Sequence, residues 1–282
     1  MKLTGLFVFR KVVELGYIPL ESFLSVEPIL DEAIVCYDPA DGDEEEHRLV
    51  KALSDKFPKV RAVEFVWPKK APGDGSVIGI ASNFALAQAA GDFCLNVQAD
   101  EIYPVALRKY IGNNWRNDAV TGYDSYRIKV LNTEHNVQQY QGGNETSSWS
   151  WQSGAGYNCA IKLFKKCPGI RFAHDAWSMD GCNLFKHLDI SETFPIIHCH
   201  DMHRDTLVKL RQTAANEIWT DREKFGAYKA TADGLEATIG EWYDDPKWTK
   251  TYSPFDHLLP DFAKPMIGQT RYVPDYSLLE RY

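Results

Sequence analysis

The residues best suited to chemistry fall in two short runs, residues 98–101 (QADE) and residues 195–204 (PIIHCHDMHR). If the second run is extended, His198 and His200 project from the same face, because side chains alternate along a strand. Imidazole suits Mn, Fe or Zn better than Mg or Ca. The run therefore predicts a metal contact, with Arg204 placed to bind a phosphate oxygen.

Strands and helices are predicted to alternate in the first hundred residues. Four apolar runs predict buried strands at residues 6–9, 33–37, 62–67 and 93–97. Helices are expected between them, beginning near Pro19, at Asp43 and at Ser82, with Gly91 ending the last. This order implies an α/β fold, a Rossmann-like and mostly parallel sheet with helices on both faces.

Right-handed crossovers place the carboxyl ends of all four strands at one edge of the sheet, where open α/β sheets bind ligands. The residues at those ends are polar: Arg10, Asp38, Lys69, Lys70, Gln98 and Asp100. We expect an acidic and basic crevice there, suited to a phosphorylated ligand. The simpler alternative is that strand ends are polar because they meet water.

Residues 83–101 (NFALAQAAGDFCLNVQADE) resemble the core of family 2-like glycosyltransferases of the GT-A fold. In that family an Asn-led helix ends in Gly-Asp, a strand follows, and a DxD-type motif closes the segment. The resemblance covers roughly residues 3 to 103. It implies an enzyme that moves a sugar from a nucleotide diphosphate donor to an acceptor hydroxyl, with inversion expected. A divalent cation, Mn or Mg, would neutralise the departing diphosphate.

The resemblance also implies roles for individual residues. Asp38, Gln98 and Asp100 would face the donor, and Asp100 would hold the cation together with His198, the best match for a late family histidine. Two departures stand out, since Gln98 replaces the first acidic residue of the motif and is a weak metal ligand, and Ser82 stands where the family often has Arg. From its position alone, Asp38 could instead be a turn residue.

An inverting transferase needs a carboxylate base to deprotonate the acceptor hydroxyl. Residues 161–172 resemble the strand, turn and strand that precede the acceptor side of these enzymes, and residues 174–180 (HDAWSMD) follow them. Asp175 and Asp180 are the candidates for the base, and neither spacing is diagnostic. If neither serves, the reaction could be retaining.

Aromatic residues on the acceptor side are candidates for stacking on a sugar. Trp149 and Trp151 lie in the polar stretch 138–158, which predicts a long lid or binding loop. Trp177 lies between the two candidate bases. The alternative for the loop tryptophans is that they anchor the loop to the body.

Three regions of one compact unit are expected. Residues 1–131 would form the nucleotide-sugar-binding core, and residues 132–205 the acceptor side with the long loop and the residues that complete the metal site. Residues 206–282 would contribute a long helix over 206–228 and an aromatic tail that wraps the domain or packs in a homo-oligomer.

Composition narrows the partners and the compartment. Lys and Arg number 31 against 39 Asp and Glu, a net charge of −8, which disfavours a broadly basic nucleic-acid binder. A glycan or lipid-linked acceptor is favoured, while a protein or a modified DNA base is also compatible. The six cysteines form no CxxC pair, and no signal peptide or membrane span is evident, so a cytoplasmic protein is expected.

Two other classes of function fit parts of the pattern. A nucleotidyltransferase also uses an α/β sheet and carboxylate-held Mg, but it usually opens with a Gly-rich loop after the first strand, and residues 10–16 (RKVVELG) supply none. A catalytically inactive nucleotide-sugar-binding protein is compatible with Gln98 in the motif.

Overall fold

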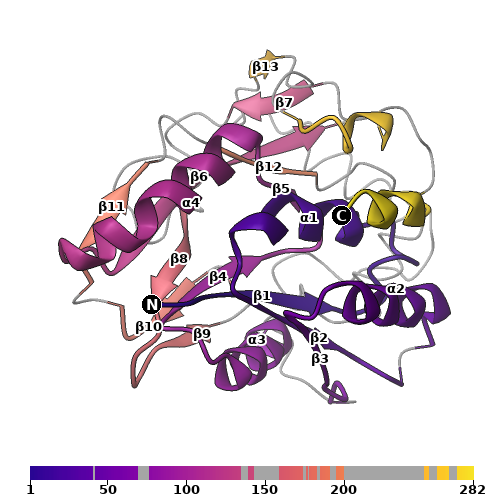
Figure 1. The fold of residues 1–282 in the computed structure, drawn as a ribbon, viewed down its shortest axis with the longest axis horizontal. Coiled ribbons are helices and arrows are strands. Elements are labelled where there is room, and N and C mark those ends of the chain that lie inside the picture. The colour runs from indigo at the N-terminus through magenta and orange to yellow at the C-terminus, as the bar shows by residue number, and fades with distance from the viewer. Residues whose placement is uncertain are drawn as a thin grey trace, which may run out of the picture.

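One large mixed sheet flanked by helices dominates the computed structural model of the chain (Figure 1). The residues that the structure describes are 1–40, 42–68, 76–134, 139–142, 159–173, 176, 178–182, 185–190, 195–199, 251–253, 259–266 and 272–282. The helix expected over 206–228 lies outside them.

Four parallel strands form the first half of the sheet. Their spatial order is β3 (Val60–Glu64), β2 (Glu32–Tyr37), β1 (Leu3–Phe9) and β4 (Phe93–Val97). All four were predicted, because each is a short apolar run. The predicted α/β class is confirmed by this strand pairing.

The second half of the sheet is mixed. Strand β8 (Cys159–Lys165) pairs antiparallel with β4 and with β6 (Ser125–Glu134), and β7 (Gln139–Gly142) and β13 (Thr251–Ser253) extend the sheet beyond β6. Three further short strands, all tied to β6 directly or through one another, are β5 (Glu101–Ile102), β11 (His187–Asp189) and β12 (Ile196–His198). A separate ribbon joins β9 (Arg171–Ala173) to β10 (Ser178–Asp180).

The helices lie on both faces of the sheet (Figure 1). They are α1 (Pro19–Val26), α2 (Glu44–Lys56), α3 (Ser76–Gln88) and α4 (Val105–Val120), with 3-10 turns η1 (Glu27–Ile29), η3 (Lys264–Met266) and η4 (Tyr276–Arg281). Pro19 is the first residue of α1, and Asp43 caps α2 by accepting a 3.0 Å hydrogen bond from the Glu46 amide. None of the helices in the described ranges is both long and apolar enough to cross a membrane.

Alternation along the strands divides the core into two layers. Leu3, Phe7 and Phe9 of β1 join the larger cluster, which α1, α2 and α4 cover, whereas Leu6 joins the smaller cluster beneath α3. Gly5 is required between them, because a Cβ atom there would lie 2.5 Å from a methyl carbon of Leu30.

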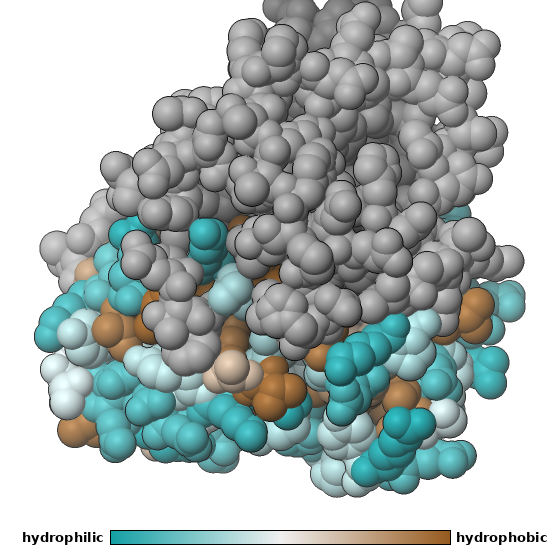
Figure 2. Space-filling view, turned by 90° about the horizontal axis from the view of Figure 1, so that it is seen from above, coloured by the Kyte–Doolittle hydropathy of each residue, from teal (hydrophilic) through white to brown (hydrophobic). Residues whose placement is uncertain are grey.

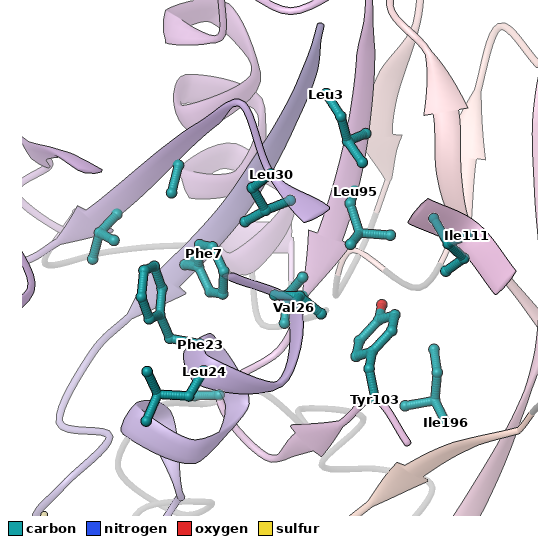
Figure 3. Close-up of a cluster of buried hydrophobic side chains, with 14 of the residues drawn as sticks. Leu3, Phe7, Phe23, Leu24, Val26, Leu30, Leu95, Tyr103, Ile111 and Ile196 are labelled. Atoms are coloured by element: carbon teal, nitrogen blue, oxygen red, sulfur yellow. The ribbon is translucent and has the colours of Figure 1, made fainter. Parts of the chain in front are cut away.

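Aromatic and aliphatic side chains fill the larger cluster (Figure 3). The rings of Phe7 and Phe23 have centroids 5.4 Å apart, so α1 packs directly on β1. Tyr103 lies near Ile111 and Ile196 in the same view, and its hydroxyl donates a 3.2 Å hydrogen bond to the Asn96 carbonyl. Seen from above, the described surface is mainly hydrophilic, with hydrophobic residues in small separate groups (Figure 2).

Several element boundaries differ from the prediction, among them the start of β1, which is Leu3 rather than Leu6 because residues from Leu3 onward pair with β4. Strand β3 ends at Glu64 rather than at Trp67, because the Trp67 amide donates to the Asp38 side chain instead of to a strand. Helix α3 begins at Ser76 rather than at Ser82, since its first turns pack on Trp67. Strand β7 lies within the stretch expected to be a loop, because its backbone pairs with β6 and β13.

The described part of the C-terminal segment packs on the first region of the chain. Leu278 and Leu279 belong to the larger core cluster, and the Tyr272 hydroxyl donates a 2.7 Å hydrogen bond to Glu21 of α1. Strand β6 runs across the boundary expected at residue 131, so the first two regions share one sheet. The division into three regions remains a prediction.

Glu21 makes the stability of this packing depend on pH. Burial raises its pKa from 4.5 to about 7, although the Tyr272 hydrogen bond works in the opposite direction. A carboxyl whose pKa is raised by folding stabilises the folded state below its unfolded pKa, and this contribution is lost as the pH rises through the folded pKa. Since one pKa unit corresponds to about 1.4 kcal/mol, the wild-type protein should lose on the order of 3 kcal/mol relative to Glu21→Gln between pH 4.5 and pH 8.

Urea unfolding of both proteins across that pH range measures the difference. Glu280→Gln, at an exposed position, is the control and should follow the wild-type profile. Parallel profiles for the wild type and Glu21→Gln would show that the pKa of Glu21 is the same in the folded and unfolded states and would contradict this prediction.

Candidate active site at the carboxyl end of β4

The turn after β4 is held by hydrogen bonds from three directions. Within the turn, the Glu101 amide donates to the Gln98 carbonyl at 3.1 Å. From the segment that begins α1, the Ser22 hydroxyl donates to the same carbonyl at 2.6 Å, and the Ile18 amide donates to the Ala99 carbonyl at 3.0 Å. The turn is therefore a rigid platform for Asp100, which is 6% exposed.

Strand β12 brings a histidine to this platform. His198 pairs in register with Glu101 of β5, and the Cys199 amide donates a 2.6 Å hydrogen bond to the Asp100 carbonyl. As a result, His198 Nε2 lies 3.3 Å from Asp100 Oδ2, with side-chain exposures of 11% and 8%. The structure thus brings together two residues from distant parts of the chain that were both named from the sequence as metal ligands.

The electrostatic environment of this pair is acidic. The pKa of the buried Cys199 thiol is raised well above its usual range by burial first, and then by the carboxylates of Asp100, Glu21 and Glu101. The negative carboxylates disfavour a thiolate and favour a cation, whereas burial disfavours both charged forms. Cys199 itself is a buried, protonated thiol and is unsuited to nucleophilic chemistry.

Glu101 is committed elsewhere. Its Oε1 lies 2.5 Å from the Lys162 ammonium of β8, and its Oε2 accepts a 3.1 Å hydrogen bond from the backbone amide of Gln98. The structure uses both oxygens of the Glu101 carboxylate to hold the turn. Sequence reasoning missed Lys162, although a lysine inside the apolar run of β8 was the available signal.

The ends of β1 and β2 meet at a tryptophan. The Arg10 guanidinium lies 4.7 Å from the centroid of the Trp67 ring, a cation–π contact. Asp38 accepts hydrogen bonds from the Ala40 amide at 2.9 Å and from the Trp67 amide at 3.2 Å. Asp38 therefore has the turn role that was its alternative from the sequence, and Trp67 is a neighbour that sequence reasoning did not select.

Gln98 contributes an acceptor at the end of β4. Within the described part of the chain, its Oε1 is buried and has no hydrogen-bond partner. A buried amide oxygen without a partner costs about 1–3 kcal/mol. It is therefore suited to accept a hydrogen bond from a hydroxyl of a ligand.

Asp180 lies away from Asp100. It forms an exposed ion pair with Arg171, with 2.8 Å from Arg171 Nη2 to Asp180 Oδ2, in the ribbon of β9 and β10. Gly181, the residue after Asp180, lies against Gly169, which follows the end of β8. At this end of β8, the Lys166 amide donates a hydrogen bond to the Asp92 carbonyl, at the amino end of β4. Asp100 follows the carboxyl end of β4, so the structure does not bring these two aspartates together.

The remaining residues named from the sequence lie outside the described residues. They are Trp149, Trp151, Asp175, Trp177, His200 and Arg204.

Asp100 and His198 are both residue types that could ligate a cation. No group of three or more His, Cys, Asp or Glu residues that could hold a metal ion occurs within the ranges that the structure describes. Mg²⁺ is commonly held by one or two carboxylates together with substrate phosphates rather than by a cage of protein ligands. The pair therefore fits a cation that is shared with a diphosphate, and the imidazole favours Mn²⁺ over Mg²⁺.

No protein-family model matches the chain, and no curated protein matches its sequence. Solved structures that are similar in fold include Staphylococcus aureus TarS in complex with UDP-GlcNAc, with a TM-score of 0.46 at 12% identity over 95% of this chain and 84% of that one. The mannosyltransferase PcManGT from Pyrobaculum calidifontis, in complex with GDP-Man and Mn²⁺, has a TM-score of 0.43 at 12% identity over 86% and 75%.

A protein from Bacillus anthracis assigned as a glucose-1-phosphate thymidylyltransferase has a TM-score of 0.37 at 10% identity over 78% of this chain and 96% of that one. TM-scores below 0.5 describe a loosely shared chain path.

Proposed function

We propose that the chain is a GT-A glycosyltransferase that moves a sugar from a nucleotide diphosphate donor to an acceptor hydroxyl with the help of a divalent cation, Mn²⁺ or Mg²⁺. The observation that carries this proposal is the 3.3 Å approach of His198 to Asp100 in an acidic, nearly buried site at the carboxyl end of β4. That edge is where open α/β sheets bind ligands. The sequence resemblance around residues 83–101 supports the same function.

The proposed donor site uses residues at the ends of four strands, β1, β2, β4 and β12. Asp100 and His198 would hold the cation, whose chemistry is to neutralise charge on the departing diphosphate. The buried Oε1 of Gln98 would accept a hydrogen bond from a ribose hydroxyl. A carboxylate offers about four acceptor positions, so Asp38 can contact the donor while it holds its two backbone amides, and Arg10 lies nearby on Trp67.

For the acceptor side, we propose inversion with Asp175 as the general base. Asp180 is the weaker candidate, because it lies with Arg171 at the amino end of β4. The carbonyl of Ala176, the residue after Asp175, lies 3.4 Å from Asn96 Nδ2 of β4. Contributions of Arg204 to phosphate binding and of His200 to the cation belong to the same proposal.

The acceptor is proposed to be a glycan or a lipid-linked precursor, stacked on one or more of Trp149, Trp151 and Trp177. A net charge of −8 makes DNA the least favourable acceptor. We also propose a cytoplasmic protein, which is supported by free thiols at Cys36, Cys94, Cys167, Cys182 and Cys199.

Loss of either proposed cation ligand should abolish turnover. Asp100→Ala and His198→Ala are each expected to reduce the release of nucleoside diphosphate from a panel of UDP- and GDP-sugars by about 100-fold or more, the scale of losing a group that stabilises transition-state charge. EDTA should have the same effect on the wild type, and added Mn²⁺ should reverse it. Asp92→Ala, at the opposite end of β4, is the control and should keep wild-type turnover.

The products separate the classes of function. Release of pyrophosphate from a nucleoside triphosphate and a sugar 1-phosphate, with no nucleoside diphosphate released from the nucleotide sugars, would indicate a nucleotidyltransferase. Release of neither product would indicate a binding protein. Unchanged turnover in Asp100→Ala would contradict the proposed mechanism.

The two candidate bases can be separated by kinetics. Asp175→Asn should lower kcat by about 10²–10⁴-fold, as expected when a general base is lost. Asp180→Asn should leave kcat within twofold, because its exposed ion pair with Arg171 contributes little to stability. The reverse pattern would assign the base to Asp180 and would require a different placement of the acceptor.

A further inference from the structure

A buried ion pair lies directly behind the proposed cation site. The side chains of Lys162 and Glu101 are 2% and 0% exposed, and their charged atoms are 2.5 Å apart. Glu101 is the residue next to Asp100 in the chain, while Lys162 comes from the middle of β8. The pair therefore connects the central sheet to the turn that carries the proposed ligand.

Stability alone is a weak explanation for this pair. Removing two charges from water is costly, and replacing a buried ion pair by apolar side chains of similar volume is often neutral or stabilising. A role in fixing one arrangement of the turn explains it better. The carboxylate of Glu101 bridges Lys162 Nζ and the Gln98 amide, while the Glu101 amide returns to the Gln98 carbonyl.

Asp100 lies within the loop that these bonds close. The same turn is also fixed by the Ser22 hydroxyl at the Gln98 carbonyl, by the Ile18 amide at the Ala99 carbonyl and by the Cys199 amide at the Asp100 carbonyl. Lys162 brings a positive charge to the carboxylates around Cys199. Its ammonium contacts Oε1 of Glu101, whereas Oε2 of Glu101 accepts the hydrogen bond that closes the turn. The Lys162 ammonium therefore fixes the position of the Glu101 carboxylate, and through this carboxylate the position of the turn.

We propose that Lys162 is a positioning residue for the cation site: through Glu101 it holds the turn so that Asp100 stays within reach of His198. This inference rests on the proposed function, because it assigns a purpose to the geometry of a cation site. Groups behind metal ligands typically change metal affinity or activity by 10- to 100-fold when they are removed.

Binding of Mn²⁺ alone, measured from the electron paramagnetic resonance signal of the free ion, tests the proposal without turnover. The double variant Glu101→Leu/Lys162→Met replaces the ion pair by apolar side chains and removes the acceptor for the Gln98 amide. It should unfold cooperatively near the wild-type temperature and bind Mn²⁺ 10- to 100-fold more weakly. Glu101→Gln, which keeps the shape but loses the ion pair, should bind Mn²⁺ about tenfold more weakly.

Lys165→Met is the matched control, because Lys165 lies on the same strand and forms an exposed ion pair with Asp124. It should bind Mn²⁺ like the wild type. If either variant of the buried pair is folded and binds Mn²⁺ within twofold of Lys165→Met, the positioning role is wrong, while the proposed function stands as long as Asp100→Ala loses Mn²⁺ binding. Failure of the wild type to bind Mn²⁺, both alone and with UDP or GDP present, would overturn both.

Discussion

The pairing of β12 with β5 is the constraint on which the site depends. Each strand is only two or three residues long, yet their ladder and the hydrogen bond from the Cys199 amide to the Asp100 carbonyl place His198 beside Asp100. Without that pairing, the turn after β4 would present one carboxylate, which is a poor site for a cation by itself. The parallel strands supply the edge, and β12 supplies the second ligand type.

Charge balance explains much of what surrounds this pairing. Three carboxylates, those of Asp100, Glu21 and Glu101, act together on the Cys199 thiol. The three carboxylates have different surroundings. Glu101 is paired with Lys162, Glu21 has a pKa raised to about 7 by burial, and Asp100 contacts His198. The acidic character that remains is directed at the position where we propose the cation.

The C-terminal segment is part of the same arrangement. Tyr272, Leu259 and Ala263 form a small buried cluster with Ile102 of β5 and Ile197 of β12. The apolar side chains of the two short strands thus pack against residues from the end of the chain, which explains how so short a ladder can be held in place.

The sequence was sufficient to predict the α/β class and the parallel strands, because buried apolar runs and helix caps such as Asp43 are local signals. The short pairing of β5 with β12 could not be predicted in detail, since strands of two or three residues have no periodicity. Lys162 was missed for a related reason: a single lysine in an apolar strand reveals its partner only when the strands are assembled. Asp38 shows a limit of the motif, because its position fitted both a donor contact and a turn. The structure shows the hydrogen bonds of the turn, and the donor contact stays a prediction.

The most direct measurement is anomalous diffraction from crystals soaked with Mn²⁺ and a nucleotide diphosphate sugar. The account predicts one strong Mn²⁺ peak at coordination distance, roughly 2.0–2.6 Å, from both Asp100 and His198, with the diphosphate completing its ligands. A nucleotide bound at the carboxyl end of β4 with its metal ion bound by other residues, or with none, would contradict it.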